Sequence, residues 1–138
     1  MTRFQMIKIN VEQFAIIASE VPDSPVSVST GIAFMYSTEA HRIACSFDIE
    51  YLTDEEKLLK LKTRCEFEIH SEDWNNFIGG NRLKIPKTLL EYFAVHTVGT
   101  ARGILFCKTE GTPFNNFIIP PIDVASIITE GIDEQIES

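Results

Sequence analysis

The sequence lacks a long hydrophobic run, and it has few cysteines and few basic residues. No stretch of about 18 apolar residues occurs, so no segment is expected to span a membrane. The three cysteines, Cys45, Cys65 and Cys107, are too few and too scattered for a disulfide framework, which favours a reducing cytoplasm. No long apolar core follows the first residues, so no secretory signal is expected. The net charge of −8 argues against binding to nucleic acid, whose phosphates need a basic face.

The sequence also lacks the spacing of a catalytic or metal site. His41, His70 and His96 are far apart, and no pair has a metal-binding spacing such as HxxxH. Trp74 is the only tryptophan, and an aromatic plug over the end of a sheet is a commoner role for it than stacking on a ligand. We therefore expect no catalytic residue, no metal ion and no cofactor. The alternative is an enzyme or a small-ligand protein, and the only residues that could support it are Trp74, the three histidines and the pair Cys45 and Cys65.

What the sequence does contain is a set of three segments in which apolar and polar residues alternate with a period of two. This pattern predicts half-buried β-strands over about 26–37, 42–51 and 59–69. A fourth strand is expected from Phe4 to Ala18, with a bulge near Met6 and Ile7, because apolar residues there change face. The apolar sides comprise Val26, Val28, Ile32, Phe34 and Tyr36, then Ile43, Cys45, Phe47, Ile49 and Tyr51, then Leu59, Leu61, Cys65, Phe67 and Ile69.

The second and third of these segments are predicted to form a hairpin. If Thr53 lies opposite Lys57, paired positions add up to 110, and three opposite-charge pairs then share one face. A slip of one residue would turn the apolar face outward, so this register is favoured. It also places Cys45 opposite Cys65, where two thiols could form a bridge or half of a metal site, or serve as small buried apolar residues. The predicted charge pairs are Glu50–Lys60, Asp48–Lys62 and Arg42–Glu68.

The second half of the chain has a helical pattern from Pro86 to about Phe106. Its buried stripe is expected to comprise Leu90, Phe93, Thr97, Ala101 and Leu105. A second stripe contains Tyr92, His96, Gly99 and Gly103, and the two glycines suggest close packing against a sheet or another helix. An apolar connector, Thr109–Val124, follows, and its Pro120 and Pro121 exclude a regular helix or a central strand. A last helix is predicted from Asp123 to Ile136, with a fraying acidic tail from Asp133 to Glu137.

The order of these elements predicts an α+β fold in one domain, residues 1–138. A four-stranded antiparallel meander sheet would be followed by a long helix, the Pro-rich connector and a short C-terminal helix on one face of the sheet.

This arrangement resembles the SecB family of cytoplasmic export chaperones over nearly the whole chain. Arg102-Gly103 lies in the long helix, as an RG pair does in the family. The segment 117–124, FIIPPIDV, stands where the family has a Pro-rich motif close to APVNF. Phe4-Gln5 begins the comparable first strand, and Glu20 to Pro25 stands where the family has a crossover loop.

The resemblance implies a homo-oligomer, a dimer of dimers, in which the long helices pack together. Tyr92, His96, Gly99 and Gly103 are then the expected interface residues. It implies no ATP and no chemistry: the clients are unfolded polypeptides held in apolar grooves between the sheet, the connector and the last helix. The client-binding candidates are Phe34, Phe114, Phe117, Ile118 and Ile119, and the alternative is that these residues pack inside the protein or between subunits.

The family delivers its clients to the SecA translocase motor through an acidic patch on the exposed face of the sheet. In this chain that face is expected to mix Arg42, Lys60, Lys62 and Arg64 with Asp48, Glu50, Glu66 and Glu68. Charges that pair with one another attract a basic partner weakly, which argues against delivery to SecA. A relative with narrower clients, such as a chaperone that guards an antitoxin, fits equally well.

Overall fold

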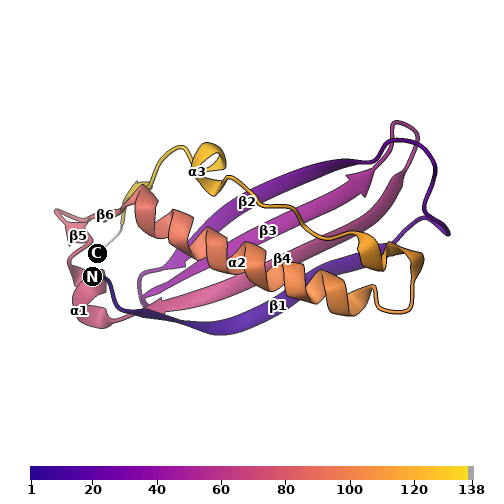
Figure 1. Ribbon diagram of the computed structural model, residues 1–138. Helices are drawn as coiled ribbons and strands as arrows, with labels where there is room; N and C mark the ends of the chain where they lie inside the picture. The colour runs from indigo at the N-terminus through magenta and orange to yellow at the C-terminus, as the bar shows by residue number, and fades with distance from the viewer. Residues whose placement is uncertain (137–138) are drawn as a thin grey trace.

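A four-stranded antiparallel sheet forms the centre of the computed structural model, which describes residues 1–136. Its strands are β1 (Phe4–Ile16), β2 (Ser27–Ser37), β3 (Arg42–Leu52) and β4 (Lys57–Ile69), in the spatial order β1-β4-β3-β2. The four predicted antiparallel strands form one sheet, but only β2, β3 and β4 follow one another as a meander. Strand β1 lies beside β4, so the segment between β1 and β2 crosses one end of the sheet, as the resemblance implied (Figure 1).

The predicted hairpin register is confirmed along nearly the whole of β3 and β4. Glu50 pairs with Lys60, Arg42 with Glu68 and Cys45 with Cys65. The irregularity comes at the turn, where Leu52 and not Thr53 pairs with Lys57. Thr53 closes the turn instead: its N–H donates to the carbonyl of Glu56, and its hydroxyl accepts from the N–H of Glu55 and of Glu56.

Strand β1 contains the predicted bulge. The register with β4 shifts between Met6 and Lys8, and it shifts again between Val11 and Gln13. Each shift returns apolar residues to the inner face, which explains why the alternation in this segment is less regular than in the others. The second bulge had no clear signal in the sequence.

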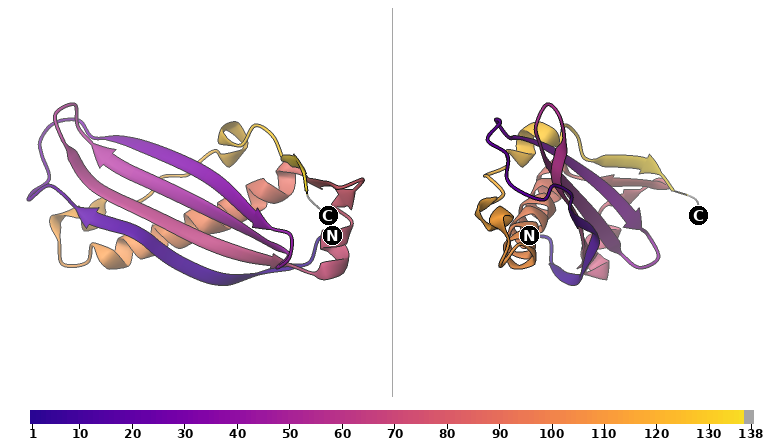
Figure 2. Two further views of the ribbon diagram at one scale, coloured as in Figure 1. Left: turned by 180° about the vertical axis from the view of Figure 1, so that it is seen from behind. Right: turned by 90° about the vertical axis from the view of Figure 1, so that its right-hand side faces the viewer.

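Helix α2 (Lys87–Lys108) runs across the inner face of the sheet and packs on β3 and β4 (Figures 1 and 2). All five residues of the predicted stripe are buried, from Leu90 to Leu105. The Phe93 ring stacks on that of Phe67 at a centroid distance of 4.3 Å. Pro86 occupies the N-cap position of the helix without a side-chain hydrogen bond, and Gly111 takes a positive φ of 77° just beyond the helix end. Seen from behind, the outer face of the sheet carries no helix among the described residues (Figure 2).

The prediction of a last helix from Asp123 to Ile136 is wrong. A 3-10 turn, η1 (Pro113–Asn116), lies within the connector, and α3 covers only Val124–Ile127. The chain then forms β7 (Ile132–Gln135), which joins β5 (Ile78–Gly79) and β6 (Arg82–Ile85) in a second, three-stranded sheet. Gly131 permits this pairing, because a Cβ there would lie 2.1 Å from the carbonyl oxygen of Ile85.

The acidic tail is also ordered further than predicted. Asp133 pairs with Arg82, and the Tyr36 hydroxyl donates to Glu134 at 2.6 Å. These contacts fix strand β7 against β6 and against the edge of the large sheet. The fraying predicted for 133–135 is therefore wrong, and Glu137 lies outside the described residues.

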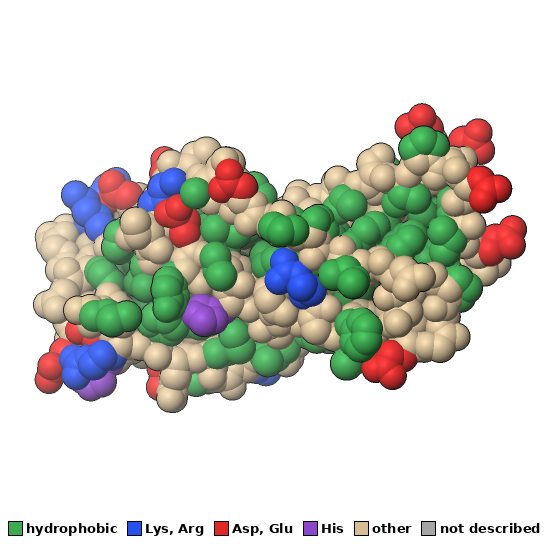
Figure 3. All heavy atoms as spheres, viewed as in Figure 1, with side chains coloured by type: hydrophobic (Ala, Val, Ile, Leu, Met, Phe, Trp, Pro, Cys, Tyr) green, Lys and Arg blue, Asp and Glu red, His purple; other side chains and the backbone are tan. Residues whose placement is uncertain are grey.

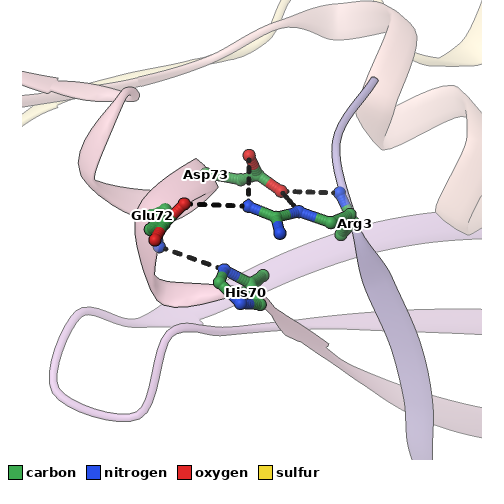
Figure 4. Close-up of polar contacts among 4 residues, drawn as sticks. All are labelled: Arg3, His70, Glu72 and Asp73. Atoms are coloured by element: carbon green, nitrogen blue, oxygen red, sulfur yellow. Dashed lines mark hydrogen bonds and ion pairs between the residues drawn. The ribbon is translucent and has the colours of Figure 1, made fainter.

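The segment after β4 contains α1 (Ser71–Asn75) as well as β5. Arg3 fastens the N-terminus to α1: its Nε donates to Asp73 Oδ2 at 2.9 Å, and its Nη2 donates to Glu72 at 3.3 Å (Figure 4). The N–H of Glu72 donates in turn to Nδ1 of His70. Trp74 is fully buried and stacks on His41, as an aromatic plug does.

Candidate binding surface around the connector

The second half of the connector, residues 117–123, returns along the inner side of the molecule from the end of α2 towards α3 (Figure 1). Arg102 of α2 holds it through two main-chain carbonyls: Nε donates to Ile119 at 2.8 Å and Nη2 donates to Pro120 at 3.1 Å. The planar guanidinium presents several donors in a fixed geometry, which suits two carbonyls in succession. The connector is therefore fixed to the helix by one side chain and not by strand pairing.

The structure separates the predicted client-binding residues into three groups. Phe114 and Ile119 are buried in the core, and each is 1% exposed. Phe117 and Phe34 are half-buried, and the Phe117 ring lies 4.9 Å from that of Tyr51. Ile118 points outward and is 62% exposed. Of the five, only Ile118 offers a large apolar area to solvent, so client contact by Phe114 and Ile119 stays a prediction that requires the connector to move.

An apolar area that was not predicted as a binding surface lies on the inner face at the end of the sheet where β2 begins. Val26 and Val28 share the inner face with Ile32 and Phe34, but they are 38% and 40% exposed, since α2 packs on β3 and β4. Val28 pairs with Tyr51, on whose ring Phe117 lies. We call Val26, Val28 and Ile118 the open-end surface. Apolar side chains gather over this end in the space-filling view (Figure 3).

The alternation of Val26 and Val28 with serines did place both residues on the inner face. It could not indicate that they stay exposed, because the coverage of a sheet depends on where the helix ends. Ile17 and Val21, in the crossing segment at the same end, are also exposed.

The predicted oligomer face lies on the outer side of α2. Tyr92, His96, Gly99 and Gly103 are all exposed, and a Cβ added to either glycine would meet no atom within 4 Å. Among residues 1–136 the glycines therefore pack against nothing, so the close contact expected for them is not with the sheet. A shallow pocket of about 530 Å³ lies beside them, lined by Val11, Ile104, Cys107 and neighbouring residues. An interface between subunits at this face stays a prediction.

The outer face of the sheet carries the mixed charges that the sequence predicts. Glu50 contacts both Lys57 and Lys60, at 3.3 and 3.6 Å, and Arg42 lies 3.6 Å from Glu68. Arg64 lies 4.0 Å from Glu66. Asp48 lies opposite Lys62 in the strand register, but their side chains form no ion pair with each other in the described part of the chain. Because most of these charges have a partner of opposite sign, the face has no continuous acidic patch.

The residues that might have supported chemistry are held apart or buried. Cys45 and Cys65 face each other as free, buried thiols, and burial raises the pKa of Cys45 to about 12. Over residues 1–136, no group of three or more His, Cys, Asp or Glu residues could hold a metal ion. In the same part of the chain, no helix is both long and apolar enough to cross a membrane.

Comparison with solved structures identifies the fold. A SecB-like chaperone from Mycobacterium tuberculosis, in complex with a peptide from an antitoxin, aligns with 87% of this chain and 84% of its own, at a TM-score of 0.54 and 11% identity. A protein of unknown function from Streptococcus agalactiae aligns with 80% of this chain and 90% of its own, at a TM-score of 0.38 and 11% identity. No protein-family model and no curated protein matches the sequence. The chain thus has a SecB-like fold.

Proposed function

We propose that this protein is an ATP-independent chaperone that binds unfolded polypeptides and keeps them from aggregating. The observation that supports this most is the open-end surface: apolar side chains of the inner sheet face, which would normally form core, stay exposed next to an apolar connector on a SecB-like fold. Exposed contiguous apolar surface commonly marks a site of interaction. An unfolded segment can bury its own apolar side chains there without any chemical step.

The same proposal includes assembly and location. The outer face of α2 exposes Tyr92, Val95 and Phe106 beside two glycines that leave its backbone accessible. A second α2 could pack closely there, and we propose a homo-oligomer, a dimer of dimers, that works in the cytoplasm. Transfer of clients to SecA for export fits the outer sheet face poorly, because its charges are paired.

The paired charges of the outer face favour a second candidate, a protein dedicated to one partner without delivery to a translocase. The structurally similar mycobacterial chaperone holds a peptide from an antitoxin. Affinity capture from the native cell distinguishes the two functions: a general chaperone returns many unrelated proteins, and a dedicated one returns a single protein in stoichiometric amount.

The proposal is tested by the aggregation of a denatured client, such as reduced insulin, followed by light scattering without ATP. We expect near-stoichiometric protein to suppress scattering, and Val26→Ser/Val28→Ser to suppress it less. Met35→Ser is the matched control, because Met35 is also exposed but lies on the outer face. No suppression of several clients by an intact oligomer would refute the proposal.

A further inference from the structure

The connector is an extended apolar segment that lies on the protein without becoming part of either sheet. Pro120 and Pro121 have no N–H to donate, and the backbone–backbone hydrogen bonds of the region are local. One runs from the N–H of Phe117 to Phe114, and another from the N–H of Val124 to Ile122. The segment between them is held by side-chain contacts and by Arg102.

Arg102 binds this segment in a way that does not depend on its side chains. Its two hydrogen bonds go to consecutive main-chain carbonyls, those of Ile119 and Pro120. The guanidinium is also half-buried and not enclosed, so water can replace the carbonyls if the connector leaves.

The surface beneath the connector contains a polar atom that the connector does not satisfy. Tyr51 is 5% exposed, and its hydroxyl has no hydrogen-bond partner among the described residues. Phe117 covers its ring and offers it only an apolar contact. Buried hydroxyls are normally paired, so one without a partner fits a site shaped for an occupant that supplies a polar group.

We propose that the connector segment 117–121 is an internal occupant of a peptide-binding site, and that an extended apolar client segment displaces it. This rests on the proposed chaperone function and adds how the site is opened. The client takes the place of Phe117 and Ile119 on the inner face, and its main chain supplies the partner that Tyr51 lacks. Arg102 is a positioning residue that keeps the connector closed until then.

The test measures how often the connector opens, by the reaction of a single thiol with a maleimide. Ile119→Cys is made with Cys107→Ser, since Cys107 is the one exposed cysteine of the three. Cys45 and Cys65 are buried and contribute little background. The probe is reduced, carboxamidomethylated α-lactalbumin, which stays unfolded and has no reactive thiol. We expect saturating probe to raise the labelling rate of Cys at 119 at least tenfold. Met35→Cys is the matched control, because its position is exposed on the outer face of the sheet, away from the connector, and should react at nearly the same rate with or without the probe.

Removal of the Arg102 contact tests the opening of the connector without a client. Arg102→Met should raise the labelling rate at position 119 about tenfold, since hydrogen bonds from a charged donor to two carbonyls are lost. It should also tighten binding of the probe, because the competent open form becomes more populated. Arg82→Met, which removes a guanidinium paired with Asp133 on β7, should change neither quantity.

The outcomes separate this inference from the chaperone function. If the probe binds tightly but leaves labelling at 119 unchanged, the client does not displace the connector and the inference is wrong, while the chaperone function stands. If the probe binds neither the wild type nor Arg102→Met, both fail. If Ile119→Cys lowers the melting temperature, Phe117→Cys gives the same readout from a half-buried position, and an unchanged rate there overturns the inference equally.

Discussion

Ile118 and Ile119 are neighbours in the chain with opposite environments, and this contrast defines the connector at the scale of single residues. The extended backbone sends Ile119 into the core and Ile118 into solvent. Arg102 fixes this orientation, because it binds the carbonyl of Ile119. The two side chains have the same chemistry, so substitutions at them differ only in what each one contacts.

We expect Ile118→Asp to weaken client binding about tenfold, because it places a charge on the open-end surface. The melting temperature should stay within about 1 °C of the wild type, because the side chain at 118 lies in solvent and not in the core. Ile119→Asp should destabilise the fold by about 3 kcal/mol or more, because it buries a carboxylate without a partner. Calorimetry and fluorescence titration with an unfolded client measure the two effects. Equal loss of stability in both variants would contradict the orientation of the connector.

The contact between Arg3 and Asp73 predicts a dependence on pH. Hydrogen bonds from the Arg3 side chain and backbone hold the pKa of Asp73 below its usual value of 3.8. A depressed pKa in the folded state stabilises the fold above the unfolded pKa, and this contribution is lost as the pH falls through the folded value. Wild type should therefore melt above Asp73→Asn at pH 7, and the difference should vanish below pH 3.8 as the folded pKa is passed. A difference that stays constant down to pH 2 would show that the carboxylate charge is not its cause.

Individual side chains differed in how well the sequence predicted them. Cys45 and Cys65 were placed opposite each other correctly, because strand register follows from alternation and charge pairing. The burial of Phe114 could not be predicted, because a residue in an irregular segment has no periodicity to show which way it points. Arg102 was noted only as part of a motif, since its hydrogen bonds join residues 17 and 18 positions apart.

At the scale of elements, α2 has one face that is buried against the sheet of its own protomer and one that is exposed. The stripe from Leu90 to Leu105 is buried on the sheet, whereas Gly99 and Gly103 face open space. Glycine lowers helix stability by about 1 kcal/mol relative to alanine, and the protomer gains no contact in return. This imbalance is explained if the backbone of α2 is approached by another subunit.

Gly103→Leu should therefore lower the oligomer mass in multi-angle light scattering, because the side chain would keep two helices apart. The protomer itself should be no less stable, since leucine is the better helix former and its Cβ would lie within 4 Å of no atom of the described residues. Ser29→Leu, at an exposed position on the outer face of the sheet, is the control and should keep the wild-type mass. Unchanged mass and unchanged stability for Gly103→Leu would refute the predicted interface.

The C-terminal elements show where a sequence pattern fails. The stretch from Asp123 to Ile136 has apolar residues at helical spacing, yet only Val124–Ile127 is helical. The chain turns into β7 because Gly131 fits against the carbonyl of Ile85 and Asp133 meets Arg82. Both contacts join segments more than 40 residues apart, so no local pattern could indicate them.

At the scale of the whole molecule, the sheet is longer than the helix that covers it. The strand meander, the crossing segment and the long helix could all be predicted, because each has a period or a break in the sequence. The uncovered end could not, since it depends on where α2 stops relative to β2. It leaves Val26 and Val28 exposed beside a connector that is itself apolar. The fold thus places its apolar exposure at one end and its paired charges on the outer face.

This separation predicts how salt affects client binding. The net charge of −8 repels acidic clients at long range, whereas burial of apolar side chains at the open end is not weakened by added salt. We expect unfolded α-lactalbumin with succinylated lysines to bind more weakly than the unmodified unfolded protein at 20 mM salt, by about tenfold, and the gap to close near 500 mM, where the screening length falls to a few ångströms. The two clients have the same apolar residues, so the gap isolates charge. If salt instead weakened both by the same large factor, ion pairs and not the apolar surface would hold the client, and the binding site would have to be sought on the outer face.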